Sequence, residues 1–573
     1  MKRYIAVSLT ALAAVWTAGA QNLNPTVEVT NQFEGKVMEV TKPVVDMAVP
    51  DSLLRFDLAF DYSVFDTPYK GTYEFSPYLL DMKPQPDAYR GSSLYLRLGA
   101  GYPLHPTADF VWSPELSGPF QVNVFGMHRS YVGGYKARLG DFGADYKGYD
   151  MLSRAGVDGR YDYTDGAFTF GAGYYGIHTK QDLVKAGYNA FDLKLGAQSL
   201  VSAANYFHYD VAAAFRGASQ GYDISDKLNT VHFSLDATAG PVFDAGHALL
   251  IDAHVGIDAY SGLFSARTGL MSVTPKYVLN ADRWRISAGL RLAAVLRSED
   301  EWMRYGLAGQ QSQVIYPDVR VGYEAVADRL NLYVSATGGD HVWNYAELKE
   351  DNHFYNPYYG RGNAPLADNS VERIRLTVGV QGNVAAKFRY DFQTGWLFMA
   401  NGLLDDVALY HDADDAYPGA PAATSPADGT WMNPAVTFED YGLFFAKGTF
   451  AYDGRPVAVD GGFRFGRPTT GPLYRGFAPA STGWLKLTYN KMDRIMAGIR
   501  AEGALRRPGG SVYELMDLYI PGYLDLGLFG EYALTRSLSL WLRADNLLNA
   551  NIQRHVLCPE SGISVTGGIV FRL

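Results

Sequence analysis

The stretch "YLDLGLFGEYALTRSLSLWLRADNLLNANIQRHVLCPESGISVTGGIVFRL", residues 523–573, ends the chain and contains three segments of alternating character. In the first segment, Leu524, Leu526 and Leu528 share one parity, whereas the acidic residues Asp525 and Glu531 share the other. Successive side chains of a β-strand point to opposite faces. The pattern therefore predicts a strand with one apolar face and one polar face.

The last segment reaches the C-terminal residue without a polar tail. Arg572 and Thr566 lie on one face of this predicted strand. The opposite face carries five apolar side chains: Leu573, Phe571, Ile569, Val565 and Ile563. We expect the apolar face to contact lipid and the other face to line a lumen. We also expect this strand to pair with the first strand, because a sheet in lipid cannot leave an edge open.

The same alternation continues upstream to about residue 91. It is clear in "RWRISAGLRL" (283–292), "RIRLTVGVQG" (373–382) and "AKFRYDFQTGW" (386–396). A soluble β-sandwich or propeller also has alternating strands, but these average about 5–6 residues. Segments of about ten residues have the length that a tilted strand needs to cross a bilayer. We therefore predict an all-β protein, a transmembrane antiparallel β-barrel over residues 91–573.

The connections between these segments alternate between short and long. Short links are predicted at 164–166, 280–283, 324–329, 382–386, 453–456, 490–493 and 534–536. Long links are predicted at 130–152, 294–311, 337–371, 399–438, 467–479, 504–518 and 546–560. Outer-membrane barrels have short periplasmic turns, long extracellular loops and an even number of strands. The rhythm predicts about 22 strands.

Composition and the N-terminus support an exported membrane protein. Residues 1–20 have the charge, apolar run and small-residue cleavage site of a signal peptide, and Cys558 is the only cysteine. The chain has 41 Tyr, 30 Phe and 61 Gly, which suits strands with aromatic girdles. Because 60 acidic residues outnumber 50 basic ones, nucleic-acid binding is disfavoured. We predict the bacterial outer membrane as the location.

The C-terminal stretch resembles the last three strands of TonB-dependent receptors, through "RADNLLN" (543–549), the loop that follows it and the Gly-rich last strand. The resemblance covers residues 310–573 well and the rest of the barrel weakly, through the rhythm of the strands alone. The resemblance implies an outer-membrane barrel that takes part in solute transport. Such receptors carry a plug domain inside the barrel, and residues 21–90 are too few for one. We expect this segment to be extended, in the periplasm or the lumen.

No segment carries a recognisable catalytic signature, such as a Gly-x-Ser-x-Gly elbow, a His-Glu-x-x-His pair or a phosphate-binding loop. We therefore expect no enzymatic activity, no catalytic residues and no cofactor. The segment "YHDADD" (410–415) combines a histidine with carboxylates. It is compatible with a metal site or with a solvated acidic loop, and we predict the loop and no metal.

Charged residues on the polar parity of the predicted strands are the candidates for the lumen wall. We expect these to face the lumen: Arg373, Arg375, Arg389, Asp391, Asp525, Glu531, Arg543, Asp545 and Arg572. They either pair across neighbouring strands in a hydrated interior or form a basic lumen that favours anionic solutes. Both readings remain open at this point.

Aromatic side chains in the predicted outer loop 351–365 form a second candidate site. They are Phe354, Tyr355, Tyr358 and Tyr359, beside Arg361. Aromatic clusters of this kind bind sugars or partner proteins, or they pack a long loop onto its own barrel. The sequence does not distinguish these roles.

Two functions fit the sequence. The first is solute transport across the outer membrane, with inward-facing residues setting the selectivity. The second is a non-transporting barrel that serves as a scaffold subunit of a larger outer-membrane complex. We expect contact with outer-membrane lipid in both cases and another outer-membrane or periplasmic protein in the second. The solute is not indicated.

Overall fold

The computed structural model describes residues 93–573 apart from 117, 182–183, 200–205, 223–226, 244–245, 264, 298–313, 328, 356–368, 386, 411–422, 425–430, 471–472 and 493. The predicted signal peptide and the segment 21–90 lie outside the described residues. No helix among the described residues is long and apolar enough to cross a membrane.

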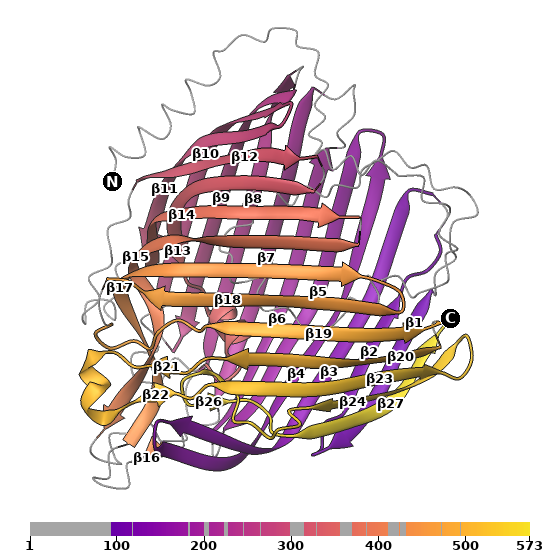
Figure 1. The fold of residues 1–573 in the computed structure, drawn as a ribbon, viewed down its shortest axis with the longest axis vertical. Helices are drawn as coiled ribbons and strands as arrows, with labels where there is room; N and C mark the ends of the chain where they lie inside the picture. The colour runs from indigo at the N-terminus through magenta and orange to yellow at the C-terminus, as the bar shows by residue number, and fades with distance from the viewer. Residues whose placement is uncertain are drawn as a thin grey trace.

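Across the described residues, 22 antiparallel strands form a closed barrel (Figure 1). The strands of the first half are β1 (Leu94–Tyr102), β2 (Thr107–Trp112), β3 (Phe120–Leu139), β4 (Phe142–Tyr163), β5 (Gly166–Gln181), β6 (Val184–Ser199), β7 (Phe207–Tyr222), β8 (Leu228–Phe243), β9 (His247–Gly262), β10 (Ala266–Ala281) and β11 (Trp284–Arg297). Those of the second half are β12 (Ile315–Val326), β13 (Leu330–Val342), β14 (Asn369–Val384), β15 (Phe388–Tyr410), β17 (Trp431–Asp453), β18 (Val457–Pro468), β19 (Thr482–Lys491), β20 (Ile495–Ala504), β23 (Tyr523–Ala533), β24 (Leu538–Asp545) and β27 (Ser564–Arg572). The predicted fold class and strand number are confirmed.

The remaining described elements are short and belong to connections at one end of the barrel. They are β16 (Ala423–Thr424), β21 (Arg507–Pro508), β22 (Tyr519–Ile520), β25 (Gln553–His555), β26 (Cys558–Pro559), the helix α3 (Tyr345–Asp351) and the 3₁₀-helix η5 (Ser511–Met516). Figure 1 shows β16, β21, β22 and β26 gathered at the lower left, away from the C-terminus. We call this the outer end, because the short turns lie at the other, periplasmic end.

The seam of the barrel joins β27 to β1, as the sequence predicts. The two strands are antiparallel, with Leu98 opposite Ile569. The Leu94 amide donates to the Leu573 carbonyl at 3.0 Å, and the Leu573 amide donates to the Leu94 carbonyl at 2.9 Å. Leu573 therefore continues the backbone hydrogen bonding between the last strand and the first.

Gly568 makes this seam possible, and its replacement gives a first testable prediction. A Cβ atom at Gly568 would collide with the Leu98 carbonyl oxygen of β1. We expect Gly568→Ala to destabilise the closed barrel by about 2 kcal/mol through overpacking and to lower its yield in the outer membrane. Heat-dependent mobility in SDS gels measures the folded fraction.

The neighbouring Gly567 supplies the control. A Cβ there would meet the Leu542 side chain only at 3.4 Å, so Gly567→Ala should assemble normally. Equal folded fractions for the two variants would show that close approach at the seam does not limit closure.

Alternate residues of the strands present an apolar exterior. Ile569 of β27, Leu528 of β23 and Leu290 of β11 are 44%, 46% and 56% exposed, each on the parity that the sequence assigns to lipid. Their neighbours of opposite parity, such as Val570 and Asp525, are buried inside the barrel wall. A closed barrel with this exterior is an outer-membrane barrel, because only lipid removes such a surface from water.

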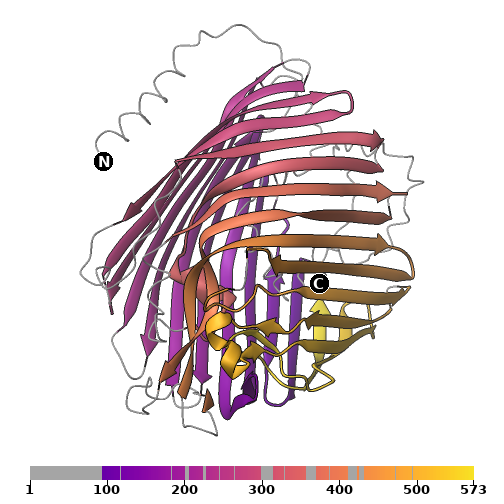
Figure 2. The ribbon, with the colours of Figure 1, turned by 60° about the vertical axis from the view of Figure 1, so that its left-hand side comes forward.

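Two of the predicted outer loops are wrong in part. Residues 130–152 are not a loop: β3 and β4 continue through them and turn at Gly140, which has a φ of 57°. Within 399–438, β15 continues to Tyr410 and β17 begins at Trp431. The sequence rhythm fails here because these strands extend past the bilayer and are stabilised by packing on other loops. Figure 2 shows the long strands of the first half facing the shorter C-terminal strands.

Candidate functional site

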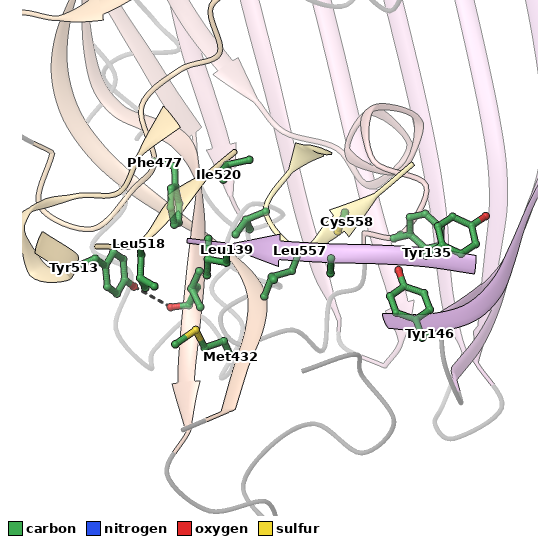
Figure 3. Packing of buried hydrophobic residues seen from close by; sticks show 14 residues of the cluster. Tyr135, Leu139, Tyr146, Met432, Phe477, Tyr513, Leu518, Ile520, Leu557 and Cys558 are labelled. Atoms are coloured by element: carbon green, nitrogen blue, oxygen red, sulfur yellow. Dashed lines mark hydrogen bonds between the residues drawn. The ribbon is translucent and has the colours of Figure 1, made fainter. Parts of the chain in front are cut away.

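A loop cap lies at the outer end of the barrel, and we define it as residues 130–152, 343–355, 399–410, 431–441, 473–481, 505–522 and 546–563. One apolar cluster holds it together (Figure 3). The cluster consists of Tyr135, Ala137, Leu139, Tyr146, Phe354, Val407, Met432, Phe477, Tyr513, Leu518, Ile520, Val556, Leu557 and Cys558. Because these residues come from distant segments, burial of their apolar surface holds those segments together at the outer end.

Helix α3 is the part of the cap that packs against the inner wall of the barrel. Asn344 caps the helix by accepting a hydrogen bond from the Glu347 amide at 2.9 Å. Tyr345 is fully buried and packs at 5.9 Å, between ring centroids, against Tyr188 of β6 and Tyr355. A helix of 7 residues is not stable alone, so these tertiary contacts fix it in place.

Charged contacts connect α3 and the residues after it to three surrounding elements, and we call them the latch pairs. Glu350 binds Arg216 of β7 at 2.6 Å, and Arg216 also binds Asp192 of β6. His353 contacts Asp150 of β4 at 2.8 Å. Asp351 contacts His555 of β25 at 3.3 Å.

The Arg216 pair is the most buried of the latch pairs. The Arg216 and Glu350 side chains are 17% and 7% exposed. Removing one partner of a buried pair leaves the other charge without compensation. The position of α3 therefore depends on Arg216.

Two buried groups of the cap, Lys349 and His555, have pKa values shifted away from their ordinary values. Lys349 is buried, and burial lowers its pKa to about 7. Its ammonium donates to the carbonyls of His353 and Tyr355, the latter at 3.2 Å. For His555, burial disfavours the charged form, but the carboxylates of Asp351 and Asp405 raise its pKa to about 9. The two shifts act in opposite directions on the stability of the cap.

The opposite pKa shifts of His555 and Lys349 predict how the stability of the cap depends on pH. His555 stabilises the cap below its ordinary value of 6.5, and this contribution is lost as pH rises towards 9. Lys349 acts in the opposite sense, because its lowered pKa adds stability as pH rises from about 7 towards 10.5. Lys349→Met removes the second contribution. We expect amide exchange of residues 345–355, corrected for its intrinsic pH dependence, to accelerate between pH 6.5 and 9 in Lys349→Met and to change less in the wild type.

Lys136 provides the matched control, because this lysine of β3 is exposed. Lys136→Met should keep the wild-type profile. If Lys349→Met also kept that profile, titration of Lys349 would not contribute to the stability of the cap.

Three of the residues predicted for the lumen wall, Asp525, Arg543 and Asp545, belong to one network near the seam. Arg500 of β20 binds Asp525 at 2.9 Å and Asp545 at 3.1 Å, and Arg543 binds Asp545 at 2.8 Å. The Asn546 amide donates to Asp525 at 2.9 Å. These charges compensate one another across neighbouring strands, as a polar barrel interior requires.

Other predicted wall residues also have partners. Arg572 binds Glu531 at 2.5 Å, so the last and antepenultimate barrel strands are connected by charge. Asp391 accepts a hydrogen bond from the Tyr333 hydroxyl at 3.0 Å. The remaining pairs are Arg375 with Glu372 at 2.7 Å and Arg389 with Asp453 at 2.7 Å.

Arg373 is placed differently from its neighbour Arg375. A β-bulge lies between Glu372 and Ile374, and it shifts the alternation of β14 at this point. The Arg373 side chain is 56% exposed and lies 3.5 Å from Asp440, which is equally exposed. Arg373 is thus separate from the buried pairs of the inner wall.

The two predicted loop aromatics that the structure describes, Phe354 and Tyr355, are buried and not exposed to solvent. Phe354 and Tyr355 are 9% and 7% exposed, and Phe354 lies edge-on to Tyr135 at 5.7 Å between ring centroids. Tyr358, Tyr359 and Arg361 lie outside the described residues, as do residues 411–415 of the acidic segment. Within the described part of the chain, no group of three or more His, Cys, Asp and Glu side chains could hold a metal ion.

The latch pairs were not among the predicted site residues. Arg216 and Glu350 are separated by 134 positions, and neither stands in a motif. One signal was present: Asn344 followed three residues later by Glu347 is typical of a helix start inside the predicted loop 337–371.

Solved structures of similar shape include receptors and an iron transporter. A variant of the ferric enterobactin receptor PfeA of Pseudomonas aeruginosa matches with a TM-score of 0.56 at 11% identity, over 84% of this chain and 80% of that one. The FrpB iron transporter of Neisseria meningitidis matches with a TM-score of 0.58 at 9% identity, over 85% and 82%. This chain has the barrel fold of TonB-dependent receptors.

A third structure supports the same fold. The siderophore receptor PirA of Pseudomonas aeruginosa matches with a TM-score of 0.53 at 10% identity, over 84% of this chain and 80% of that one. No protein-family profile matches the chain, and no curated protein matches it in sequence. At these identities the likeness to TonB-dependent receptors is one of fold.

Proposed function

We propose that this protein transports a solute across the outer membrane and that the loop cap is its outer gate. One observation carries the proposal: α3 is held against the inner wall by the latch pairs, which are side-chain contacts, and not by backbone pairing with a barrel strand. Charged side-chain contacts can break and re-form without disturbing the sheet. The fold of receptors and transporters supports the same function.

Below the cap, the inner wall is hollowed and carries charged side chains. A cavity of about 450 Å³ lies along β3 to β8, and Asn123, Asp158, Lys194 and Asp236 are among its lining residues. This volume is in the range of small-molecule sites. A solute that passes the cap would meet both charges and hydrogen-bonding groups there.

The periplasmic side of the passage is assigned to the N-terminal segment. The described chain enters the barrel at Ser93, beside the C-terminal residue Leu573 and hence at the periplasmic end. We propose that residues 21–90 form an extended segment in the periplasm or the lumen. Two barriers, the cap and this segment, would then keep a large barrel from leaking.

Single-channel recording tests the proposal. The intact protein should be closed most of the time, and a form without residues 21–90 should show more frequent openings. Steady conductance of the intact chain would contradict a gated passage. Silence of the shortened form under conditions that loosen the cap would contradict transport.

A scaffold role is the second candidate, because the cap has an apolar core in addition to its charged contacts. A cap that never opens would suit a barrel whose task is to hold a partner protein in the outer membrane. Purification in mild detergent distinguishes the two. A stoichiometric partner with no conductance would favour the scaffold, and a barrel that always purifies alone would oppose it.

A further inference from the structure

Three lysines lie on adjacent strands at the outer end of the barrel, and we call them the lysine cluster. They are Lys136 of β3, Lys147 of β4 and Lys180 of β5. The register places Gly134 opposite Lys147 and Tyr149 opposite Lys180, so each lysine is the diagonal neighbour of the next. Diagonal neighbours on one face of a sheet are about 7–8 Å apart, within reach of long side chains. One anionic headgroup can therefore contact two of the lysines at once.

The alternation of the three strands places the lysine cluster on the outside of the barrel. Nearer the periplasmic end, the residues of the same parity on these strands include exposed aromatic side chains of the lipid face: Phe120, Tyr161 and Tyr174. The register of the strands shows no shift between these positions and the lysines. Tyr135 and Tyr146, which have the opposite parity, are buried in the apolar cluster of the cap. The lysines therefore point away from the lumen, towards the membrane surface.

Within the described part of the chain, the three lysines make no hydrogen bond or ion pair. Asp145 stands opposite Lys136 in the register, but its carboxylate binds Arg138 at 2.7 Å. Lys185 of β6 stands opposite Lys180. Because Lys185 has other contacts, we do not count it in the lysine cluster.

Other exposed arginines at the outer end have carboxylates beside them. Arg506 binds Asp517 at 2.9 Å, and Arg373 lies 3.5 Å from Asp440. The lysine cluster differs from these pairs, because it is a local excess of positive charge on the outside of the barrel. Such an excess attracts anions from the surroundings of the protein.

The height of the lysine cluster above the apolar band indicates the kind of anion. On the lipid face of β5, the last Phe or Tyr is Tyr174, whose hydroxyl donates to Asn189 at 2.6 Å. Lys180 lies roughly 14 Å higher than Tyr174, for a strand that rises about 3.3 Å per residue at a tilt of about 45°. The headgroup layer of an ordinary bilayer extends only about 5–8 Å beyond the hydrocarbon. A lipid with a larger headgroup is needed to reach the lysines.

We propose that the lysine cluster binds a glycolipid of the outer leaflet whose sugar headgroup carries phosphate. The acyl chains lie against the apolar face of β3, β4 and β5, and the phosphate groups accept hydrogen bonds from the lysine ammonium groups. Charge-assisted hydrogen bonds of this kind are stronger than neutral ones. Tyr149, opposite Lys180 on the same face, adds a hydroxyl for the sugar. The site lies outside the barrel and does not depend on the passage of a solute.

Native mass spectrometry of the purified full-length protein in mild detergent tests the site. The probes are lipid A with two phosphates, lipid A without phosphates, phosphatidylglycerol and the acyl-free headgroup glucosamine 1-phosphate. We expect the diphosphorylated lipid A to bind at least about ten-fold more tightly than each of the other three. Equal binding of lipid A without phosphates would overturn the role of charge. Equal binding of phosphatidylglycerol or of glucosamine 1-phosphate would overturn the assignment to a phosphorylated glycolipid.

Substitutions test whether the lipid binds at the lysine cluster. Lys136→Gln, Lys147→Gln and Lys180→Gln should each weaken the binding of diphosphorylated lipid A about five-fold, and the triple variant about 100-fold. Lys491→Gln is the matched control, because Lys491 is also exposed but lies at the periplasmic end of β19, and it should keep the wild-type affinity. Heat-dependent gel mobility confirms that each variant is folded. Wild-type affinity in a folded triple variant would overturn the site.

Discussion

Replacing Arg216 with alanine is expected to open the outer end of the barrel. The substitution leaves Asp192 and Glu350 without their cation, and the Glu350 side chain is only 7% exposed. Removal of one partner from a buried pair costs about 3 kcal/mol or more. At about 1.4 kcal/mol for each factor of ten, the open probability should rise about 100-fold. Single-channel recording of the form without residues 21–90 measures this most directly.

An exposed ion pair supplies the control. Arg160 binds Asp162 at 2.7 Å, but the two side chains are 35% and 37% exposed, so Arg160→Ala should change little. Glu350→Gln is a second comparison, because it removes the buried negative charge and keeps the shape of the side chain. It should open the barrel less than Arg216→Ala does. Identical traces for the wild type and Arg216→Ala would show that the latch pairs do not hold the cap.

Replacing Ile569 with aspartate should prevent most of the protein from assembling. Ile569 lies near the middle of β27, faces lipid, and stands opposite Leu98 and Leu540 on the two neighbouring strands. A charge on the lipid face costs about 2 kcal/mol near the bilayer centre. The cost falls on the strand that closes the barrel, so we expect a large loss of heat-modifiable protein in the outer membrane.

The neutral substitution Ile569→Ala is the control for this prediction. It shortens the side chain without placing a charge in lipid, and lipid chains can occupy the space. Its yield should stay close to that of the wild type. Normal assembly of Ile569→Asp would contradict the assignment of this face of β27 to lipid.

The strands of the barrel wall could be predicted from the sequence because each strand is determined by the residues within it. A strand between lipid and a polar lumen must alternate, and Leu528 and Asp525 obey this rule on one strand just as Ile569 and Arg572 do on another. The pairing of β27 with β1 could be predicted because a sheet in lipid cannot leave an edge unpaired. The alternation predicted the wrong surroundings for Arg373, because a β-bulge after Glu372 shifts the alternation and has no sequence signature of its own.

The cap could not be predicted because it is determined by packing between segments that are far apart in the sequence. Leu139 of β3 is buried in the same cluster as Leu557, and no periodicity connects residues so far apart in the chain. The strands at 130–152 extend past the bilayer because they pack against the loops at 505–522 and 546–563. Arg216 and Glu350 meet for the same reason. Long-range packing selects these contacts, and a single sequence does not encode it as a pattern.

The reactivity of Cys558 tests the closed cap most directly. Cys558 is the only cysteine of the chain and lies in the apolar cluster of the cap (Figure 3). Burial raises the pKa of its thiol to about 12, so the reactive thiolate is scarce. On intact cells, a membrane-impermeant maleimide should label Cys558 at least about 100-fold more slowly than in the unfolded chain, and faster in Arg216→Ala. Labelling of the wild type at the rate of the unfolded chain would contradict a closed outer mouth.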